Sequence, residues 1–158
     1  MLFYIWIRFE WQFSLGAITA LVHDVIITVG IFSFLAYEVN LSIVAAVLTI
    51  VGYSMNDTVV IFDRIRENLK KYSKISITEI SDLSTNQTLS RTLITSVTTL
   101  LALISIYIFG GAILKGFSFA MIIGVIVGTY SSIFVATPIL NYTNVNQKTV
   151  LKDNTENG

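Results

Sequence analysis

Residues 92–140, TLITSVTTLLALISIYIFGGAILKGFSFAMIIGVIVGTYSSIFVATPIL, decide the fold of this chain, because Lys115 is the only charged side chain among them. A helix needs about 20 mostly apolar residues to cross the roughly 30 Å hydrocarbon core of a bilayer. The stretch is long enough for two such helices, one on each side of Lys115. It therefore predicts a pair of membrane-spanning helices joined by a short turn.

Two earlier stretches pass the same test of length. Residues 14–37 are predominantly apolar apart from His23 and Asp24, and residues 39–62 apart from Asp57. We therefore predict an all-α membrane protein, a polytopic helix bundle with four full spans. The predicted spans cover residues 14–37, 39–62, 92–114 and 116–138, within a membrane domain of residues 1–140.

The opening segment Met1–Ile7 is apolar and aromatic but far too short to cross a bilayer. We interpret it as an N-terminal helix stub, the end of a helix whose beginning lies outside this sequence. A signal peptide is a poorer interpretation, because the segment has no basic region and no small-residue cleavage site.

The composition excludes several classes of function. Apolar residues make up 54% of the chain and charged residues 13%, against about 45–50% and about 25% in soluble domains. With 10 basic and 10 acidic residues, there is no basic surface for a nucleic acid. Because the chain has no cysteine and a single histidine, we expect no metal site and no cofactor. This composition is typical of a protein that is surrounded by membrane lipid.

Lysine and arginine indicate the orientation, because short loops rich in these residues stay in the cytoplasm. Of the 10 basic residues, only Lys115 falls on one side of the predicted spans. The other side holds Arg8, Arg91, the basic residues of the connection 64–90 and those of the tail 141–158. We therefore expect both termini and this connection in the cytoplasm.

The cytoplasmic connection 64–90 contains the pattern of a helix start. Ser76 and Glu79 have the spacing of a capping box, in which each side chain satisfies a backbone donor of the other residue. Ile77, Ile80 and Leu83 follow at intervals of three. We expect either a short amphipathic helix on the inner membrane surface or a solvated linker.

The chain after the last span is expected to lose its helical structure. Pro138, the single proline, lies near the inner end of that span and can end the helix. The tail 141–158 is polar and has no periodicity, so we predict that it is disordered.

Asp57 is the first candidate functional residue, because a carboxylate in hydrocarbon costs about 2.5–3.5 kcal/mol on insertion scales. It belongs to a polar stripe on the second span, and the third span carries a matching stripe. A buried acid satisfied by neighbouring polar groups is the structural alternative. The stripes consist of Thr49, Tyr53, Asn56 and Asp57 on one helix, and of Arg91, Thr95, Thr98, Ala102 and Ser105 on the other.

Two further features are open to a structural or a functional interpretation. His23 and Asp24 are adjacent and point about 100° apart on a helix, so a structural hydrogen bond or packing role competes with proton relay. Gly124 and Gly128 form a small-xxx-small motif, which lets another backbone approach the last span. We expect this face to contact a partner protein.

Four segments carry a family resemblance. Residues 52–68 read GYSMNDTVVIFDRIREN, residues 86–92 NQTLSRT, residues 124–132 GVIVGTYSS and residues 20–25 ALVHDV. Together they resemble the SecF branch of the SecD/SecF protein-export family, within the RND superfamily. The resemblance runs to about Leu140, and the order Asn56-Asp57-Thr58 favours SecF over SecD. It implies that this chain lacks the family's first helix and periplasmic domain.

The resemblance implies a function in protein export. Such a protein would be a proton-motive-force-coupled accessory subunit of the Sec translocase in the bacterial cytoplasmic (inner) membrane, and not an enzyme. Its partners would be SecD, the SecYEG channel, the SecA motor and the preprotein substrate. The residues implied are Asp57 and Arg91 for proton relay, with Asn56, Thr58, Tyr53 and Thr95 as a supporting polar face, His23 and Asp24 as further candidates, and Gly124 and Gly128 for helix packing.

Three alternative functions compete with this interpretation. A fragment of an RND-type proton-driven small-molecule exporter would carry two adjacent acids on one helix, whereas this chain has Asn56 before Asp57. Intramembrane proteolysis by Asp24 and Asp57 requires a Gly-x-Gly-Asp motif that neither residue has. An inactive scaffold fragment of SecF remains the simplest structural alternative.

Overall fold

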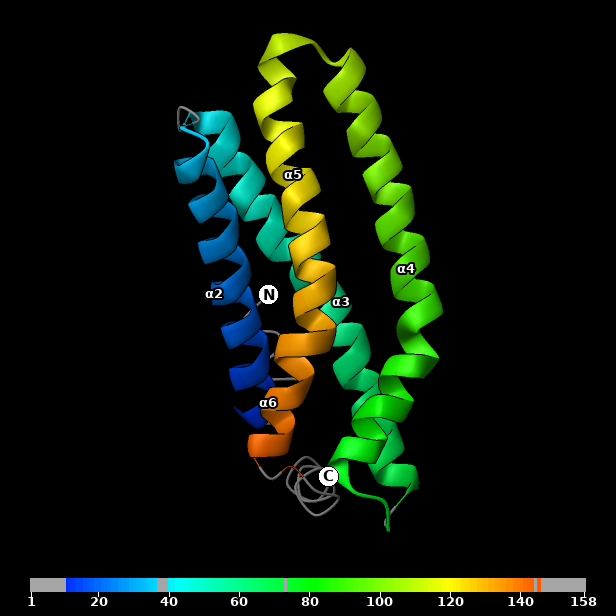
Figure 1. Cartoon of the computed structure of the whole chain (residues 1–158). Coiled ribbons are helices and arrows are strands. Elements are labelled where there is room, and N and C mark those ends of the chain that lie inside the picture. Colours follow the sequence, from blue (N-terminus) through cyan, green and yellow to red (C-terminus); the bar gives the residue numbers. More distant parts are fainter. Residues whose placement is uncertain (1–10, 37–39, 73, 144, 146–158) are drawn as a thin grey trace, which may run out of the picture.

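The computed structural model describes residues 11–36, 40–72, 74–143 and 145, and almost all of them are helical (Figure 1). Four helical segments are long and apolar enough to span a membrane, which confirms the predicted all-α bundle. Met1–Ile7 and nearly all of the tail after Thr143 lie outside the described residues. The elements are α2 (Trp11–Phe34), α3 (Leu41–Lys71), α4 (Ile77–Phe109), α5 (Gly111–Ser131), the π-helix η1 (Ser132–Ala136) and α6 (Thr137–Tyr142).

Side-chain caps define where α3 and α4 begin. The Asn40 side-chain oxygen accepts a hydrogen bond from the Ile43 backbone N–H at 3.1 Å. The Ser76 hydroxyl accepts from the Glu79 N–H at 3.3 Å, and the Glu79 carboxylate accepts from the Ser76 N–H at 3.2 Å. The capping box predicted from the sequence is therefore present, and Ile77 is the first helical residue.

The connection between the second and third spans is much shorter than the predicted segment 64–90. Helix α3 continues to Lys71, and α4 runs without interruption from Ile77 through the third span. No separate surface helix precedes that span. The reason is that the sequence contains no glycine or proline between Gly52 and Gly110, so nothing ends either helix early.

Glycine ends α4 and starts α5. Gly111 has a φ of 73°, a left-handed conformation that glycine adopts at no steric cost. A Cβ on Gly110 would lie 2.4 Å from the Ile106 carbonyl oxygen, so a side chain does not fit there. The chain therefore reverses at these two residues, and the third span ends at Phe109 rather than at 114.

Pro138 does not end the last span, contrary to expectation. The five residues of η1 precede it, and α6 continues the helix to Tyr142. A proline in a helix removes one N–H donor and crowds the carbonyl four residues earlier. The wider π-helical turn moves that carbonyl away from the proline ring, and we infer that it relieves the clash.

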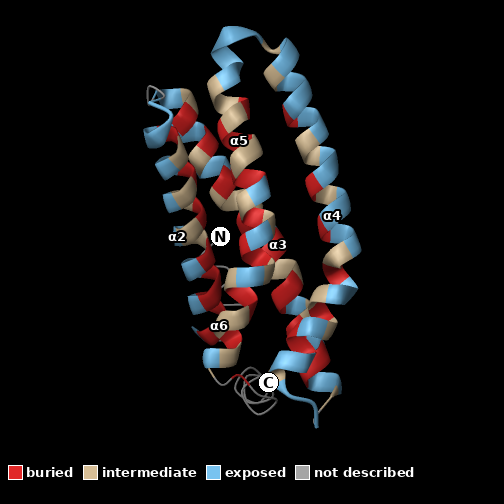
Figure 2. Cartoon of the chain, in the orientation of Figure 1, coloured by how far each residue is buried: buried red, intermediate tan, exposed pale blue. Residues whose placement is uncertain are grey.

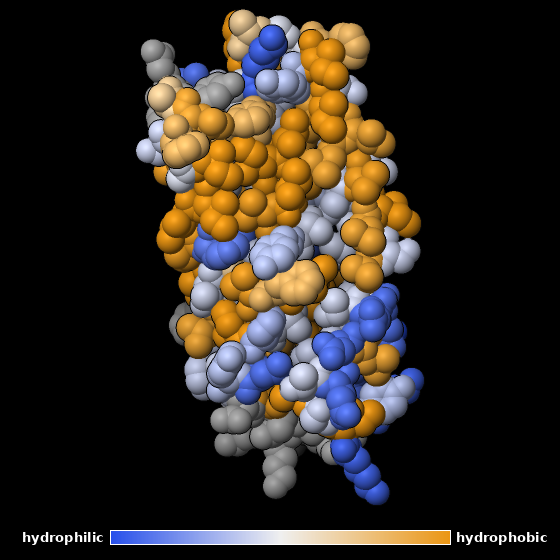
Figure 3. Space-filling model, viewed as in Figure 1, coloured by the Kyte–Doolittle hydropathy of each residue, from blue (hydrophilic) through white to orange (hydrophobic). Residues whose placement is uncertain are grey.

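Helix α5 packs against α2, α3 and α4, and α3 also contacts both α2 and α4 (Figures 1 and 2). In its most apolar window, only 17% of α4 is buried within the chain, against 33–44% for the other spans. Figure 3 shows apolar surface over much of the upper molecule and hydrophilic residues gathered at the lower ends of α3 and α4. Helix α4 therefore presents most of its surface to lipid or to another protein.

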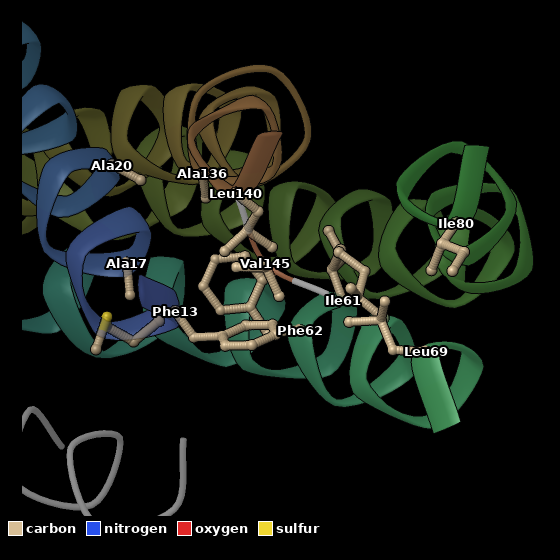
Figure 4. Close-up of a cluster of buried hydrophobic side chains, with 12 residues drawn as sticks. Phe13, Ala17, Ala20, Ile61, Phe62, Leu69, Ile80, Ala136, Leu140 and Val145 are labelled. Atoms are coloured by element: carbon tan, nitrogen blue, oxygen red, sulfur yellow. The ribbon is translucent and has the colours of Figure 1, made fainter. Parts of the chain in front are cut away.

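Two apolar clusters hold the bundle together. The lower cluster joins α2, α3, the start of α4, η1 and α6 (Figure 4). Its Phe13 and Phe62 rings pack edge to face, with their centroids 5.3 Å apart. The upper cluster joins α2, α3, α4 and α5 and includes Phe32, Ile50 and Val125. Helices α2, α3 and α4 each contribute to both clusters, and the last span does so through α5 in the upper cluster and through η1 and α6 in the lower one.

Candidate functional site

A polar layer lies where three helices cross from one cluster to the other. It contains Asp24 of α2, Ser54 of α3 and Ser131 of α5, each positioned along its helix between members of the two clusters. All three side chains are buried. Because apolar packing on both sides excludes water from buried positions, these polar groups must satisfy one another.

Asp24 is the centre of this layer and has no solvent-exposed surface. Its Oδ2 accepts hydrogen bonds from the Ser54 hydroxyl at 2.5 Å and from the Ser131 hydroxyl at 2.8 Å. Its Oδ1 lies 3.1 Å from Nδ1 of His23. The carboxyl group thus ties α2 to both α3 and α5.

A second set of hydroxyls extends this network along α3 and η1. The Thr58 hydroxyl lies 2.9 Å from the Ser132 hydroxyl and donates to the Ser54 carbonyl at 3.1 Å. Ser132 also lies 2.9 Å from the Gly128 carbonyl oxygen. The network therefore reaches Thr58, the residue that follows Asp57.

Asp57 is also buried, with 3% of its surface exposed, but its setting differs. Its Oδ2 is enclosed and has no hydrogen-bond partner among the described residues. Arg91 of α4 acts on it electrostatically, although no ion pair joins the two side chains in the described part of the chain. The second and third spans thus place this acid within electrostatic reach of this base, and a proton-relay role for the two residues stays a prediction.

A groove opens between α3 and α4, and its lining on α3 begins at Val60, three residues after Asp57. It has a volume of about 290 Å³. Arg64 is held there by Gln87, at 2.6 Å, and by Glu67, at 2.5 Å. The lining residues are Val60, Asp63, Arg64, Glu67, Gln87, Thr88 and Arg91. Charged side chains of α3 and uncharged polar side chains of α4 therefore line the groove together with Arg91.

The other predicted polar residues are divided between the inside and the outside of the chain. Asn56 is exposed, whereas Thr58 is buried in the hydroxyl network. The Tyr53 hydroxyl is buried and has no hydrogen-bond partner in the described part of the chain. Thr95 is half-buried and donates to the Arg91 and Thr92 carbonyls of its own helix.

The third-span stripe lies mainly on the surface of the chain. Arg91, Thr98, Ala102 and Ser105 are exposed. The buried polar face of α4 is a neighbouring one, on which the Ser96 hydroxyl lies 2.7 Å from the Thr129 hydroxyl of α5. The predicted stripe is therefore available to a second protein.

Gly124 and Gly128 pack closely against α3 of the same chain, which corrects the expectation that they contact a partner protein. A Cβ on Gly124 would lie 2.2 Å from Ile50, and one on Gly128 would lie 3.1 Å from the Ser54 Cβ. The correction has a physical reason, because these glycines let α5 approach α3 closely enough for Ser54 and Ser131 to share Asp24.

Sequence reasoning missed Ser54, Ser131 and Ser132 as site residues. Serine is common in membrane helices because its hydroxyl can donate to the carbonyl one turn earlier, so a single serine carries little signal. The available signal was the spacing of small residues, since Ser131 and Ser132 continue the face of Gly124 and Gly128 at helical intervals.

No metal centre is indicated in the described part of the chain. None of its His, Asp and Glu side chains gather in threes or more. The side chains of the site offer carboxyl, hydroxyl, imidazole and guanidinium groups.

Comparison with known sequences points to one family. Residues 1–146 match the family described as protein export membrane protein SecD/SecF, C-terminal. A protein translocase subunit SecF from Rhodobacter capsulatus is 54% identical over 153 residues, which are 97% of this chain and 46% of the relative. One from Rickettsia bellii is 59% identical over 140 residues, 89% of this chain and 46% of that relative. The chain thus spans about half the length of these relatives.

Solved structures agree with this similarity. A crystal structure of SecDF in a super-membrane-facing form superposes with a TM-score of 0.86 at 41% identity, covering 98% of this chain and 21% of that one. SecDF from Thermus thermophilus, described as a translocon-associated membrane protein, superposes with a TM-score of 0.87 at 45% identity, covering 91% and 20%. The bundle is thus similar to part of a larger membrane protein.

Proposed function

The chain belongs to the SecD/SecF family of protein-export membrane proteins, and from this premise we propose that it is an accessory subunit of the Sec translocase that uses the proton-motive force to assist preprotein export. It acts with a SecD partner, beside the SecYEG channel and the SecA motor, in the bacterial cytoplasmic membrane. Both termini lie on the cytoplasmic side. The proposal is supported by the SecF relatives and by the setting of Asp57.

The proposal of proton coupling is based on Asp57, whose enclosed Oδ2 has no hydrogen-bond partner among the described residues. A buried acceptor without a partner costs about 1–3 kcal/mol, more if it is charged. Proton uptake from the groove between α3 and α4 removes the charge, and release to the other side restores it. Asp57 can therefore alternate between two states, because neither is locked by hydrogen bonds within the described chain.

Arg91 converts this change of charge into a change of packing. When Asp57 is ionised it attracts the guanidinium group across the α3–α4 interface, and when it is neutral this attraction is lost. Helix α4 is the least buried span, so it has the least apolar packing to break if it moves. One charge crossing the membrane potential supplies about 2.3 kcal/mol per 100 mV, enough to bias such a two-state arrangement.

The exposed polar stripe of α4 supports a contact with SecD. Polar side chains at membrane depth usually face protein or a water-filled cavity rather than lipid. Because the chain has no native cysteine, single cysteines at Thr98 and, as a control, at the exposed Ile26 of α2 are specific probes. We expect cross-linking to co-expressed SecD from position 98 only. Equal cross-linking from both positions would contradict this interface.

The proton step is tested by Asp57→Asn and Arg91→Leu. Each variant is joined to the part of the Rhodobacter capsulatus relative that this chain does not cover, and is assembled with SecD in inverted vesicles. We expect each variant to bind SecD normally and to lose the gradient-dependent increment of preprotein translocation. The measurement is late-stage translocation without ATP, with and without a proton gradient.

Matched controls keep this experiment specific. Asp82→Asn removes an exposed carboxylate of α4, and Lys71→Leu removes an exposed cation of α3, so both should keep the full increment. If Asp57→Asn also keeps it, Asp57 is structural and the proton assignment is wrong. If the unsubstituted chain shows no increment, the chain is a scaffold rather than a proton-coupled subunit.

A further inference from the structure

Asp24 has a feature that proton transfer at Asp57 does not explain. It is fully buried, yet among the described residues no lysine or arginine forms an ion pair with it, and its titratable neighbour is His23. Helix α2 carries no basic group besides His23, Lys115 of α5 lies 16 residues before Ser131, and residues 117–142 of α5, η1 and α6 carry no ionisable group other than the Tyr130 and Tyr142 hydroxyls. On α3, Tyr53 and Asp57 are the nearest titratable residues to Ser54 along the helix. A proton on the carboxyl group or on His23 would balance the charge of Asp24 within this layer.

His23 provides a route for that proton. Its side chain is 30% exposed, whereas that of Asp24 is fully enclosed, and its Nδ1 lies 3.1 Å from Oδ1 of Asp24. An imidazole can accept a proton at Nε2 from outside and release one from Nδ1 to an acceptor. His23 is thus placed between the surface of the chain and the buried acid.

The hydroxyl groups around Asp24 can reorient when the carboxyl group gains a proton, so that each hydrogen-bond donor still has an acceptor. The Ser131 hydroxyl lies 2.8 Å from Oδ2 and 3.2 Å from the Gly128 carbonyl oxygen. When Oδ2 gains a proton, it can donate to the Ser131 oxygen while the Ser131 hydrogen turns to Gly128. The bond from Ser54 then ends on a neutral acid, and hydrogen bonds to neutral groups are about half as strong as those to ionised ones.

We propose that His23 and Asp24 form a second proton-binding site, separate from Asp57, whose protonation loosens the tie between α2 and α3 at Ser54. The proton enters through the imidazole of His23 and rests on the Asp24 carboxyl group. The site shares α3 with Asp57 but includes neither Asp57 nor Arg91. It holds whether or not Asp57 proves to be the proton-coupling residue.

Infrared difference spectroscopy tests the binding of the proton. The full chain, purified and reconstituted in lipid, is titrated from acidic to alkaline pH, and the carbonyl stretch of protonated carboxyl groups is followed. We expect one band of this kind to be lost in Asp24→Asn and kept in Asp57→Asn and Asp82→Asn. If Asp24→Asn leaves every titrating band in place, Asp24 does not exchange protons and the proposal is overturned.

Variants of the neighbouring groups test the route and the network while leaving Asp24 itself in place. We expect His23→Phe to slow the appearance of the Asp24 band after a pH jump, and Ser131→Ala to displace its midpoint. Ser118→Ala is the matched control, because this buried serine of α5 donates only within its own helix. Equal displacement by both serine variants would overturn the role of the network.

The change in packing is measured between spin labels. Cysteines at Val22 of α2 and Leu48 of α3, both exposed, carry nitroxides in the otherwise cysteine-free chain. We expect the distance distribution to broaden on acidification and to become independent of pH in Asp24→Asn. A response to sodium ions at constant pH, in place of the response to protons, would show a cation site and overturn the proposal.

Discussion

Two aspartates are buried in the membrane helices of this chain, and their hydrogen-bonding environments differ. Asp24 receives hydrogen bonds from two serines on two other helices and lies against His23. Asp57 keeps one enclosed oxygen without a partner, and an arginine on α4 balances it from beyond ion-pair distance. In the hydrogen-bonded state seen here, Asp24 ties α2 to α3 and α5, whereas Asp57 makes no hydrogen bond among the described residues that would hold α3 to α4. The two acids therefore differ in how much each contributes to holding the helices together.

The largest expected effect comes from removing each carboxyl group in turn. Asp24→Leu leaves two buried hydroxyls and an imidazole without their acceptor, and we expect it to destabilise the bundle by about 3 kcal/mol. Asp57→Leu removes an unsatisfied oxygen, so we expect stability to stay the same or to rise. Thermal unfolding in detergent, followed by circular dichroism, measures both. Equal losses of stability in the two variants would contradict the proposed difference between Asp24 and Asp57.

A smaller effect is expected from pushing α5 away from α3. In Gly128→Ala the new Cβ would lie 3.1 Å from the Cβ of Ser54 and would strain its bond to Asp24. We expect a loss of about 1–2 kcal/mol, as for moderate overpacking. Gly52→Ala is the control, because a Cβ there meets nothing within 4 Å. A neutral Gly128→Ala would show that the Asp24 junction tolerates separation.

The smallest effect on stability is expected at Arg91. Because Arg91 is exposed and makes no ion pair with Asp57 in the described chain, Arg91→Gln should change the unfolding free energy by no more than about 0.5 kcal/mol. The same variant should still lose gradient-dependent translocation. Arg64→Gln, which breaks two exposed contacts, provides the comparison. A large loss of stability in Arg91→Gln alone would make Arg91 a structural residue.

Several features could be predicted from the sequence because their causes are local. The four spans follow from the length of their apolar runs, and the start of α4 follows from Ser76 and Glu79, three residues apart. The lengths of α3 and α4 were underestimated, since charge was used to end the helices although charged residues continue a helix outside the membrane. The site was predicted in part, because an acid in an apolar run is conspicuous, whereas its serine partners are not.

By itself, the sequence determined the number of spans, the cap at the start of α4 and the family, since hydropathy, capping and family motifs are all properties of short segments. Only the tertiary structure decided which groups meet. Asp24 finds Ser54 30 residues away and Ser131 107 residues away, and Gly124 meets Ile50 rather than a second protein. These contacts depend on how closely and at what angle the helices cross. Periodicity along one helix tells which face is polar, but the approach of the neighbouring helix decides what that face touches.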